Sequence, residues 1–232
     1  MQLLITSAAS PLAQALTAEL QGEYTLRLTE RAPNPSLANF ALSPLGPDLS
    51  TNLLVRGMDA IVHVAEPLPT DNELQQIDYL TRCTYNLCMA AAAEGVKRLI
   101  YLSTLDLMTA YDPNYKVNER WKSRPTTDAP LLAKHLGEFT CREFAREYKL
   151  TVVVLRVGKL VQAEMVAGQP VDPLWVDTRD VAQAVGRALT AEVPRWSILH
   201  VQGDGPQARF SVDAAKRMLG YAPQYKFEEG AQ

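Results

Sequence analysis

The chain has 232 residues, 47% of them hydrophobic and 21% charged, and a formal net charge of −3. This composition predicts one folded domain of ordinary size and excludes a disordered chain. The small negative charge gives no electrostatic reason to expect nucleic acid or an anionic membrane as a partner. Since no stretch of about 20 apolar residues exists, we also expect no membrane span.

Cysteine and histidine usage bears on location and metal binding. An odd number of cysteines without close metal-ligand spacing indicates reduced, buried thiols in a cytoplasmic protein. The histidines show no metal-ligand spacing either, so no metal is expected. His63 lies on an apolar strand, and we expect a core histidine whose ring is hydrogen bonded. The three cysteines all fall in helical patterns: Cys83, Cys88 and Cys141.

The start of the chain predicts a buried strand, a tight turn and a helix. Residues 3–5 are apolar without alternation, as in a parallel strand that is covered on both faces. Pro11 suits the first helical position, and apolar residues then recur at helical spacing as far as Leu20. The N-terminus of such a helix directs N–H groups and the positive end of its dipole at whatever lies above the turn.

The rest of the chain alternates strands with helices and contains no repeats. This alternation predicts an α/β fold with a doubly wound parallel sheet, Rossmann-like, over a single domain, residues 1–232. Ligands of such sheets bind at the carboxyl ends of the strands. The expected strands are 24–30, 40–42, 59–65, 98–104, 151–156 and 198–201, and the expected helices are 48–55, 73–94, 131–148, 177–190 and 211–219.

Two charged residues end the second predicted strand. Glu30 follows the first turn by roughly 20 residues, where a dinucleotide-binding unit places the acid that holds the adenosine ribose hydroxyls. Arg31 comes next and is suited to a 2′-phosphate. The alternative is that the pair forms only a solvated strand end, and the two residues alone do not decide between these interpretations.

Several segments together resemble the extended short-chain dehydrogenase/reductase family of nucleotide-sugar epimerases and dehydratases. The strongest is GMDAIVHVA at residues 57–65, which is similar to the family's "gvDaVvHlA" strand. The resemblance implies NAD or NADP as cofactor, with NAD slightly preferred, and a reduced C-terminal substrate-binding part formed by about 158–176 and 203–232. The other matching segments are 84–87, 90–104, Lys134 with Glu138, 155–156, 176–182 and 214–223.

The departures from the family pattern fall on its chemistry. The resemblance makes Lys134 the lysine of the family's Y-x-x-x-K pair, and the tyrosine position is then Pro130. Proline has no ionisable group and cannot move a proton. Thr104 matches the hydroxyl that hydrogen-bonds the substrate, and the helper asparagine is replaced by Leu80. The catalytic residues that remain are then Thr104 and Lys134, without the tyrosine that they would assist.

A tyrosine elsewhere could substitute for the missing one. Tyr111 and Tyr115 lie in the polar loop 109–130 that follows the Thr104 strand. We expect both rings to pack that loop instead.

The glycine loop of the family is also altered. Its T-G-x-x-G-x-x-G pattern becomes Thr6 to Ala13, with Ser7 and Ser10 in place of the first two glycines. A β-carbon at the second glycine obstructs close approach of the backbone to a pyrophosphate. Asp48 matches an acid near the adenine, although it is equally suited to cap the helix that follows. The resemblance places the cofactor against Ser7, Ser10, Pro11, Leu12, Glu30, Arg31, Asp48, Leu49, Ala65, Lys134 and Val157.

Two functions follow from this resemblance. One is an active NAD(P)-dependent oxidoreductase or epimerase that acts on a sugar-like or carbonyl substrate with an unusual acid/base. The other, favoured because several losses fall in one pocket, is a relative without hydride transfer that binds a nucleotide or a protein partner; binding of no cofactor at all remains open. Both predict a dimer, with itself or a related chain, through helices 73–94 and 131–148. The apolar residues expected to supply that surface are Tyr79, Cys83, Leu87, Leu136, Phe139 and Phe144.

Overall fold

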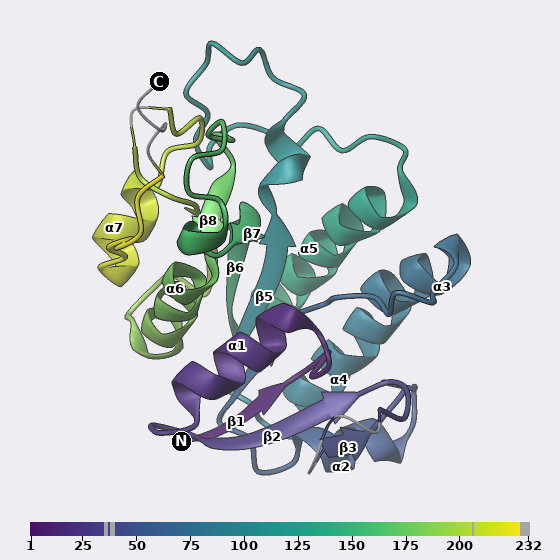
Figure 1. Ribbon diagram of the computed structural model, residues 1–232. Coiled ribbons are helices and arrows are strands. Elements are labelled where there is room, and N and C mark those ends of the chain that lie inside the picture. The colour runs from purple at the N-terminus through teal and green to yellow at the C-terminus, as the bar shows by residue number, and fades with distance from the viewer. Residues whose placement is uncertain (35–36, 38–39, 206, 228–232) are drawn as a thin grey trace.

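The protein is a three-layer α/β structure built on one seven-stranded sheet (Figure 1). The computed structural model describes residues 1–34, 37, 40–205 and 207–227. All described neighbours in this sheet run parallel, in the order β3-β2-β1-β4-β5-β6-β9. The predicted doubly wound sheet is therefore confirmed. The strands are β1 (Gln2–Ile5), β2 (Thr25–Glu30), β3 (Phe40–Leu42), β4 (Ala60–His63), β5 (Arg98–Thr104), β6 (Thr151–Val157) and β9 (Trp196–Val201).

Helices cover both faces of the sheet, and each face has its own apolar core. One core packs α1 (Pro11–Leu20) and α6 (Thr178–Thr190) on the strands. The other packs α2 (Leu49–Val55), α4 (Thr84–Ala93) and α5 (Ala129–Glu147) on the opposite face. Strands β1, β4, β5 and β6 contribute buried side chains to both cores, which explains their continuous apolar runs.

The helix predicted at 73–94 has three parts. An α-helix, α3 (Glu73–Asp78), leads into a π-helical turn, Tyr79–Cys83, and α4 then completes it. Asn72 begins α3 with a capping box, in which its side chain and that of Gln75 bond each other's backbone N–H groups. Gly95, at φ +74°, follows α4 and allows the chain to leave the helix in the left-handed region.

The C-terminal part adds a second, small sheet that the sequence did not predict. Strands β7 (Lys159–Val161) and β8 (Trp175–Asp177) pair in parallel, and α7 (Asp213–Leu219) packs near β9. The division into a main body and a lobe formed by 158–176 and 203–232 stays a prediction. Residues 206 and 228–232 of that lobe lie outside the described residues.

Candidate functional site

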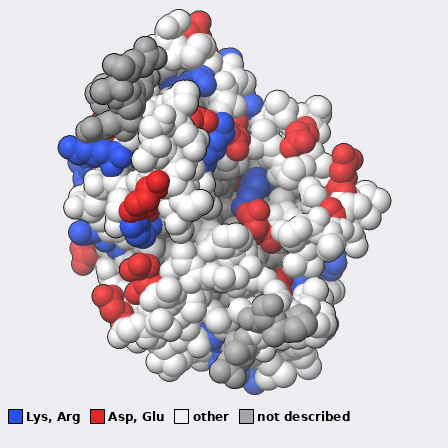
Figure 2. All heavy atoms as spheres, viewed as in Figure 1, with Lys and Arg blue, Asp and Glu red and all other residues white. Residues whose placement is uncertain are grey.

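Polar and charged side chains gather at the carboxyl edge of the sheet, where β1 and β4 are neighbours although the chain connects them through β2 and β3. This change of direction in strand order is where open α/β sheets bind ligands. In the view of Figure 2 the surface is hollowed between the part that carries α6 and α7 and the helices α3 and α5. Side chains of both charges lie in the hollow.

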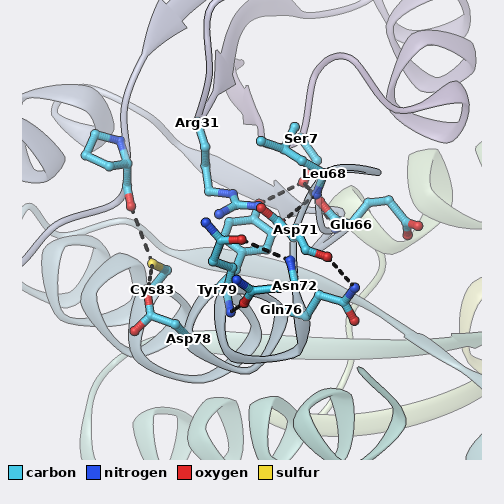
Figure 3. Close-up of polar contacts among 12 residues, drawn as sticks. Ser7, Arg31, Glu66, Leu68, Asp71, Asn72, Gln76, Asp78, Tyr79 and Cys83 are labelled. Carbon is cyan, nitrogen blue, oxygen red and sulfur yellow. Dashed lines mark hydrogen bonds and ion pairs between the residues drawn. The ribbon is translucent and has the colours of Figure 1, made fainter. Parts of the chain in front are cut away.

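The turn after β1 is closed by a side-chain network of its own. Ser7 adopts φ +51°, in the left-handed region that favours glycine. Its hydroxyl donates to Glu66 O at 3.0 Å, accepts from Glu66 N at 3.1 Å, and lies 2.7 Å from the Tyr79 hydroxyl (Figure 3). Burial raises the pKa of Tyr79 to about 12, so this phenol stays neutral. The residue that replaces the first glycine therefore ties the turn to the segment after β4 and to the π-helical turn.

The N–H groups of this turn are largely used within the chain. Pro11 has no N–H, and of the other N–H groups at residues 8–14, which the structure describes in full, only that of Leu12 lacks a protein acceptor. The turn thus offers a pyrophosphate few donors without rearrangement. The bonded N–H groups are Ala8 to Thr29 O (3.1 Å), Ala9 to Glu30 Oε2 (3.0 Å), Ser10 to Ser7 O (2.9 Å), Ala13 to Ser10 Oγ (3.2 Å) and Gln14 to Ser10 O (3.0 Å).

The two charged residues at the end of β2 are both engaged. Glu30 is only 3% exposed, and its second carboxylate oxygen accepts from Arg31 N at 2.7 Å. The Arg31 guanidinium forms an ion pair with Asp71 and lies 3.9 Å from the centre of the Tyr79 ring (Figure 3). The predicted alternative of a merely solvated strand end does not describe this geometry.

Lys134 reaches from α5 to the same edge of the sheet. Its Nζ donates to Leu102 O at 2.8 Å and to Val64 O at 3.2 Å, so the amine spans the ends of β4 and β5. Burial lowers the pKa of Lys134 to about 8, although Glu66 and Glu138 act in the opposite direction. Pro130 is the second residue of α5, one turn before Lys134, where a missing N–H costs nothing.

Thr104 lies at the end of β5 and is bound to its own loop. Its hydroxyl donates to Asp106 Oδ2 at 2.9 Å and accepts from Asp106 N at 3.1 Å, which caps the short 3-10 helix Leu105–Met108. Leu80, at the helper-asparagine position, is fully buried. This position therefore supplies no polar group in place of the asparagine.

Tyr111 and Tyr115, in the loop 109–130, both pack against Trp121. The Tyr111 hydroxyl donates to Lys122 O at 2.7 Å, and its ring meets Trp121 edge to face. Tyr115 is 55% exposed and also lies against Trp121. Among the described residues, neither ring has a contact with Lys134. The tyrosine beside this lysine is Tyr101 on β5, whose hydroxyl donates to Lys134 O at 3.4 Å and whose ring centre lies 5.8 Å from Nζ. Tyr101 is fully buried, and burial raises its pKa well above the usual value, so this phenol is not placed as a substitute acid/base.

The remaining predicted contacts are structural elements of the same edge or of its rim. Asp48 caps α2 by accepting from Ser50 N at 2.8 Å, and hydrogen bonds from Ser50 lower the pKa of its carboxyl. Leu49 follows it on α2 and is exposed. Ala65, at φ +53°, is buried just after β4, and Val157 ends β6. Their roles in cofactor binding stay predictions.

Sequence reasoning missed a buried charge cluster beneath this edge. Arg156 and Glu138 form an ion pair at 2.6 Å, with both side chains almost completely buried. Ser103 donates to the same carboxylate at 2.6 Å. In the sequence, Glu138 serves only to align Lys134 with the family pattern. Its spacing from Arg156 does not indicate an ion pair, because the two residues meet only when α5 packs on β5 and β6.

His63 is the core histidine that the sequence predicted. Its ring nitrogens contact the hydroxyls of Thr6 at 2.8 Å and Thr84 at 3.0 Å. Burial, with the charge of Lys134, lowers the pKa of His63 to about 3. Within residues 1–34, 37, 40–205 and 207–227, no group of three or more histidine, cysteine or acidic residues is placed to hold a metal, and no helix is long and apolar enough to cross a bilayer.

Comparison with known proteins adds to this geometry. The model of the NAD dependent epimerase/dehydratase family matches residues 4–170. A NAD-dependent glucose-6-phosphate dehydrogenase from Haloferax volcanii is 23% identical over 249 aligned residues, which cover 95% of this chain and 92% of that protein. A uronate dehydrogenase from Pseudomonas putida is 26% identical over 231 residues, covering 96% of this chain and 84% of the relative.

A solved structure agrees with the fold. A mutant of uronate dehydrogenase from Agrobacterium tumefaciens, complexed with NAD, superposes with a TM-score of 0.82. It is 22% identical and is matched over 96% of this chain and 84% of its own. At this level of identity the likeness concerns the arrangement of strands and helices.

Proposed function

The chain belongs to the NAD-dependent epimerase/dehydratase family, and from this premise we propose that it binds NAD(H) at the carboxyl edge of its sheet without catalysing hydride transfer by the family's route. The single observation behind this proposal is Pro130. It stands one helical turn before Lys134, in the place that the resemblance assigns to the proton-transferring tyrosine.

Dehydrogenation of a sugar hydroxyl requires a base for the hydroxyl proton while hydride leaves the carbon. When bound, the cofactor supplies the hydride acceptor. Lys134 and Thr104 remain to hold hydroxyl groups, but the hydrogen-bond partners of Lys134 Nζ are the backbone carbonyls of Val64 and Leu102, which do not take up protons. These contacts support the proposal that the family's route of proton transfer is lost.

Support for binding comes from the relatives and from the site itself. The Haloferax volcanii relative is named as NAD-dependent, and the Agrobacterium tumefaciens structure is complexed with NAD. Glu30 lies beside the turn after β1, as an acid for the adenosine ribose would, although its oxygens now accept from Ala9 N and Arg31 N. Because those bonds must rearrange and the turn offers few free donors, we expect weak affinity, at best in the micromolar to millimolar range.

The test compares wild type with Pro130→Tyr. NADH formation is followed by absorbance with NAD and, in turn, a uronic acid, glucose 6-phosphate and L-arabinose, while calorimetry measures NADH binding. We expect wild type to bind NADH and to form none. Pro130→Tyr restores a phenol one turn from Lys134 and should exceed the matched control Pro130→Phe by at least tenfold on one of these sugars.

Wild-type turnover at a rate comparable to the Tyr variant would overturn the catalytic half of the proposal. Lack of NADH binding up to millimolar concentration would overturn the binding half. Retention of Thr104 and Lys134 at the strand ends favours the second candidate, an active dehydrogenase with a non-standard base, and wild-type turnover is the result that would establish it.

We also propose that the chain forms a dimer through α3, α4 and α5. The structure changes the residues that would carry this contact. Tyr79, Cys83, Leu87 and Phe144 are buried in the chain's own core and are not available, whereas Leu136 is 45% and Phe139 41% exposed. Other exposed apolar residues on these helices are Leu74, Ile77, Tyr85, Met89 and Leu132. The cytoplasmic location inferred from the cysteines stays a prediction.

A further inference from the structure

Arg31 directly follows β2, and two contacts fix the position of its guanidinium. Its guanidinium forms an ion pair with Asp71 and stacks at 3.9 Å from the centre of the Tyr79 ring. Only 16% of the Arg31 side chain and 6% of the Asp71 side chain is exposed. Figure 3 shows the pair bridging the segment after β2 and the segment after β4.

Asp71 is held in place independently of Arg31. The same oxygen that meets the guanidinium accepts from Leu68 N at 2.8 Å, and Asp71 N donates to Leu68 O at 3.0 Å. Gln76 donates to Asp71 O at 3.0 Å from the first turns of α3. The position of the Asp71 carboxylate is therefore set by its own turn and does not depend on Arg31.

Arg31 and Asp71 line a pocket that has equal numbers of basic and acidic side chains in its wall. This pocket, of about 440 Å³, is bordered by Arg31 and Arg82 and by Asp71 and Asp78, with Arg82 and Asp78 paired at 2.6 Å. Arg82 holds the pKa of the Asp78 carboxyl below its usual range, so Asp78 is ionised at neutral pH. Two guanidinium groups face two carboxylates, and the pocket presents no excess positive charge.

We propose that Asp71 determines cofactor choice by neutralising Arg31, so that the chain accepts NAD(H) and disfavours cofactors with a 2′-phosphate. This inference rests on the proposed function and specifies its cofactor. An arginine next to the ribose acid ordinarily accommodates the 2′-phosphate of NADP. Here that phosphate must displace Asp71 from Arg31 and remain near two fixed carboxylates, Asp71 and Glu30, which costs electrostatic free energy.

The test replaces the charge of Asp71 and keeps its shape. Asp71→Asn retains an oxygen that can accept from Leu68 N but frees the guanidinium of Arg31. Dissociation constants for NADH and NADPH, and for the adenosine-end probes 5′-ADP and 2′,5′-ADP, are measured by calorimetry at fixed low salt. We expect wild type to bind NADH more tightly than NADPH, and Asp71→Asn to strengthen NADPH binding by about tenfold with little change for NADH.

Two further variants separate charge from structure. Asp78→Asn removes the other carboxylate of the same pocket, which pairs with Arg82, and should improve NADPH binding much less because Asp78 does not touch Arg31. Arg31→Met in the Asp71→Asn background should abolish the gain, because the phosphate then has no guanidinium to meet. Far-UV circular dichroism and melting temperature check that each variant is folded.

The outcomes distinguish the two proposals. Equal gains for NADH and NADPH in Asp71→Asn, or a gain that survives Arg31→Met, would overturn the assignment of cofactor choice to Asp71. Absence of NADH binding by wild type would overturn the proposed function, and the ratio of 2′,5′-ADP to 5′-ADP affinity would still test Asp71. A wild type that prefers NADPH would contradict this inference while leaving binding itself intact.

Discussion

At the scale of single residues, Lys134 has the most unusual environment at the candidate site. A charged ammonium group is held by two carbonyl oxygens and partly removed from water, with no carboxylate in direct contact among the described residues. Its pKa falls from 10.5 to about 8 because burial disfavours the charged form. The lysine therefore releases its proton more readily in the folded chain than in the unfolded one.

This difference predicts a pH-dependent stability. Below pH 8 both states are protonated and the cost of burying the charge is fully present. Between pH 8 and 10.5 the unfolded state binds more protons, so the contribution of Lys134 to stability rises with pH. Relative to Lys134→Met, wild type should gain on the order of 2 kcal/mol across this window, measured by urea unfolding at several pH values.

Taking the difference in free energy of unfolding between wild type and Lys134→Met at each pH cancels the contribution of the titratable groups that both proteins share. Lys149→Met, which deletes an exposed lysine, serves as the control for the loss of a surface charge. A constant difference between wild type and Lys134→Met from pH 7 to 10.5 would show that Lys134 is not desolvated as the structure indicates.

Residue positions illustrate what sequence reasoning can and cannot reach. Lys134 and Pro130 lie four apart on one helix, so a motif fixes their relation without coordinates. Arg31 was recognised as a candidate phosphate ligand, but Asp71 lies 40 residues further along the chain and carries no motif. Their pairing depends on how the segment after β4 turns back, which no local pattern encodes.

At the scale of elements, α5 lies unusually close to the sheet at Gly137. A Cβ at this position would overlap Tyr101 Oη on β5 and would lie 2.9 Å from Leu80 O in the π-helical turn. Glycine weakens a helix interior by about 1 kcal/mol relative to alanine, so its presence here is explained by the close approach. The approach brings the Lys134 side chain to the strand ends.

Gly137→Ala should therefore destabilise the protein in spite of the better helix propensity of alanine. We expect a loss of about 1–3 kcal/mol in free energy of unfolding, because α5 must move away from β5 or Tyr101 must shift. Gly186→Ala on α6 is the matched control, since its Cβ would meet only Leu20 Cδ2, at 3.6 Å. Chemical denaturation that ranks the two variants in the opposite order would contradict this account of α5.

Elements were predictable where one physical signal dominates. The apolar runs of β1, β4 and β6 and the Asp48 cap of α2 placed those elements within a few residues. The π-helical turn Tyr79–Cys83 was not predictable, because its residues have ordinary helix-forming chemistry. Strands β7 and β8, at three residues each, are too short to show a period.

At the scale of the whole molecule, the exposed apolar residues on α3, α4 and α5 form the face on which a second copy would pack. The free energy gained by covering such side chains is about 25 cal/mol per Å² of apolar surface. A single exposed leucine or phenylalanine is ordinary, but several on three adjoining helices are what the proposed dimer requires.

Light scattering coupled to size-exclusion chromatography should report a mass of about two chains for wild type at micromolar concentration. The double variant Leu136→Glu with Phe139→Glu should elute as one chain, because burying the two new carboxylates across the contact is unfavourable. Leu160→Glu on β7, which is 41% exposed and belongs to the small second sheet, should remain dimeric. Wild type that stays monomeric at high concentration would exclude the dimer.

The all-parallel sheet has a consequence for how this chain reaches its native state. Each described ladder of the main sheet joins strands through a crossover, so no hairpin is available to nucleate it locally. Strand β1 gains its second neighbour only once β4 has been synthesised, and β6 waits for β9 near the end of the chain. Until those later strands have emerged from the ribosome, β1 and β6 each have an unpaired edge, which exposes the nascent chain to aggregation.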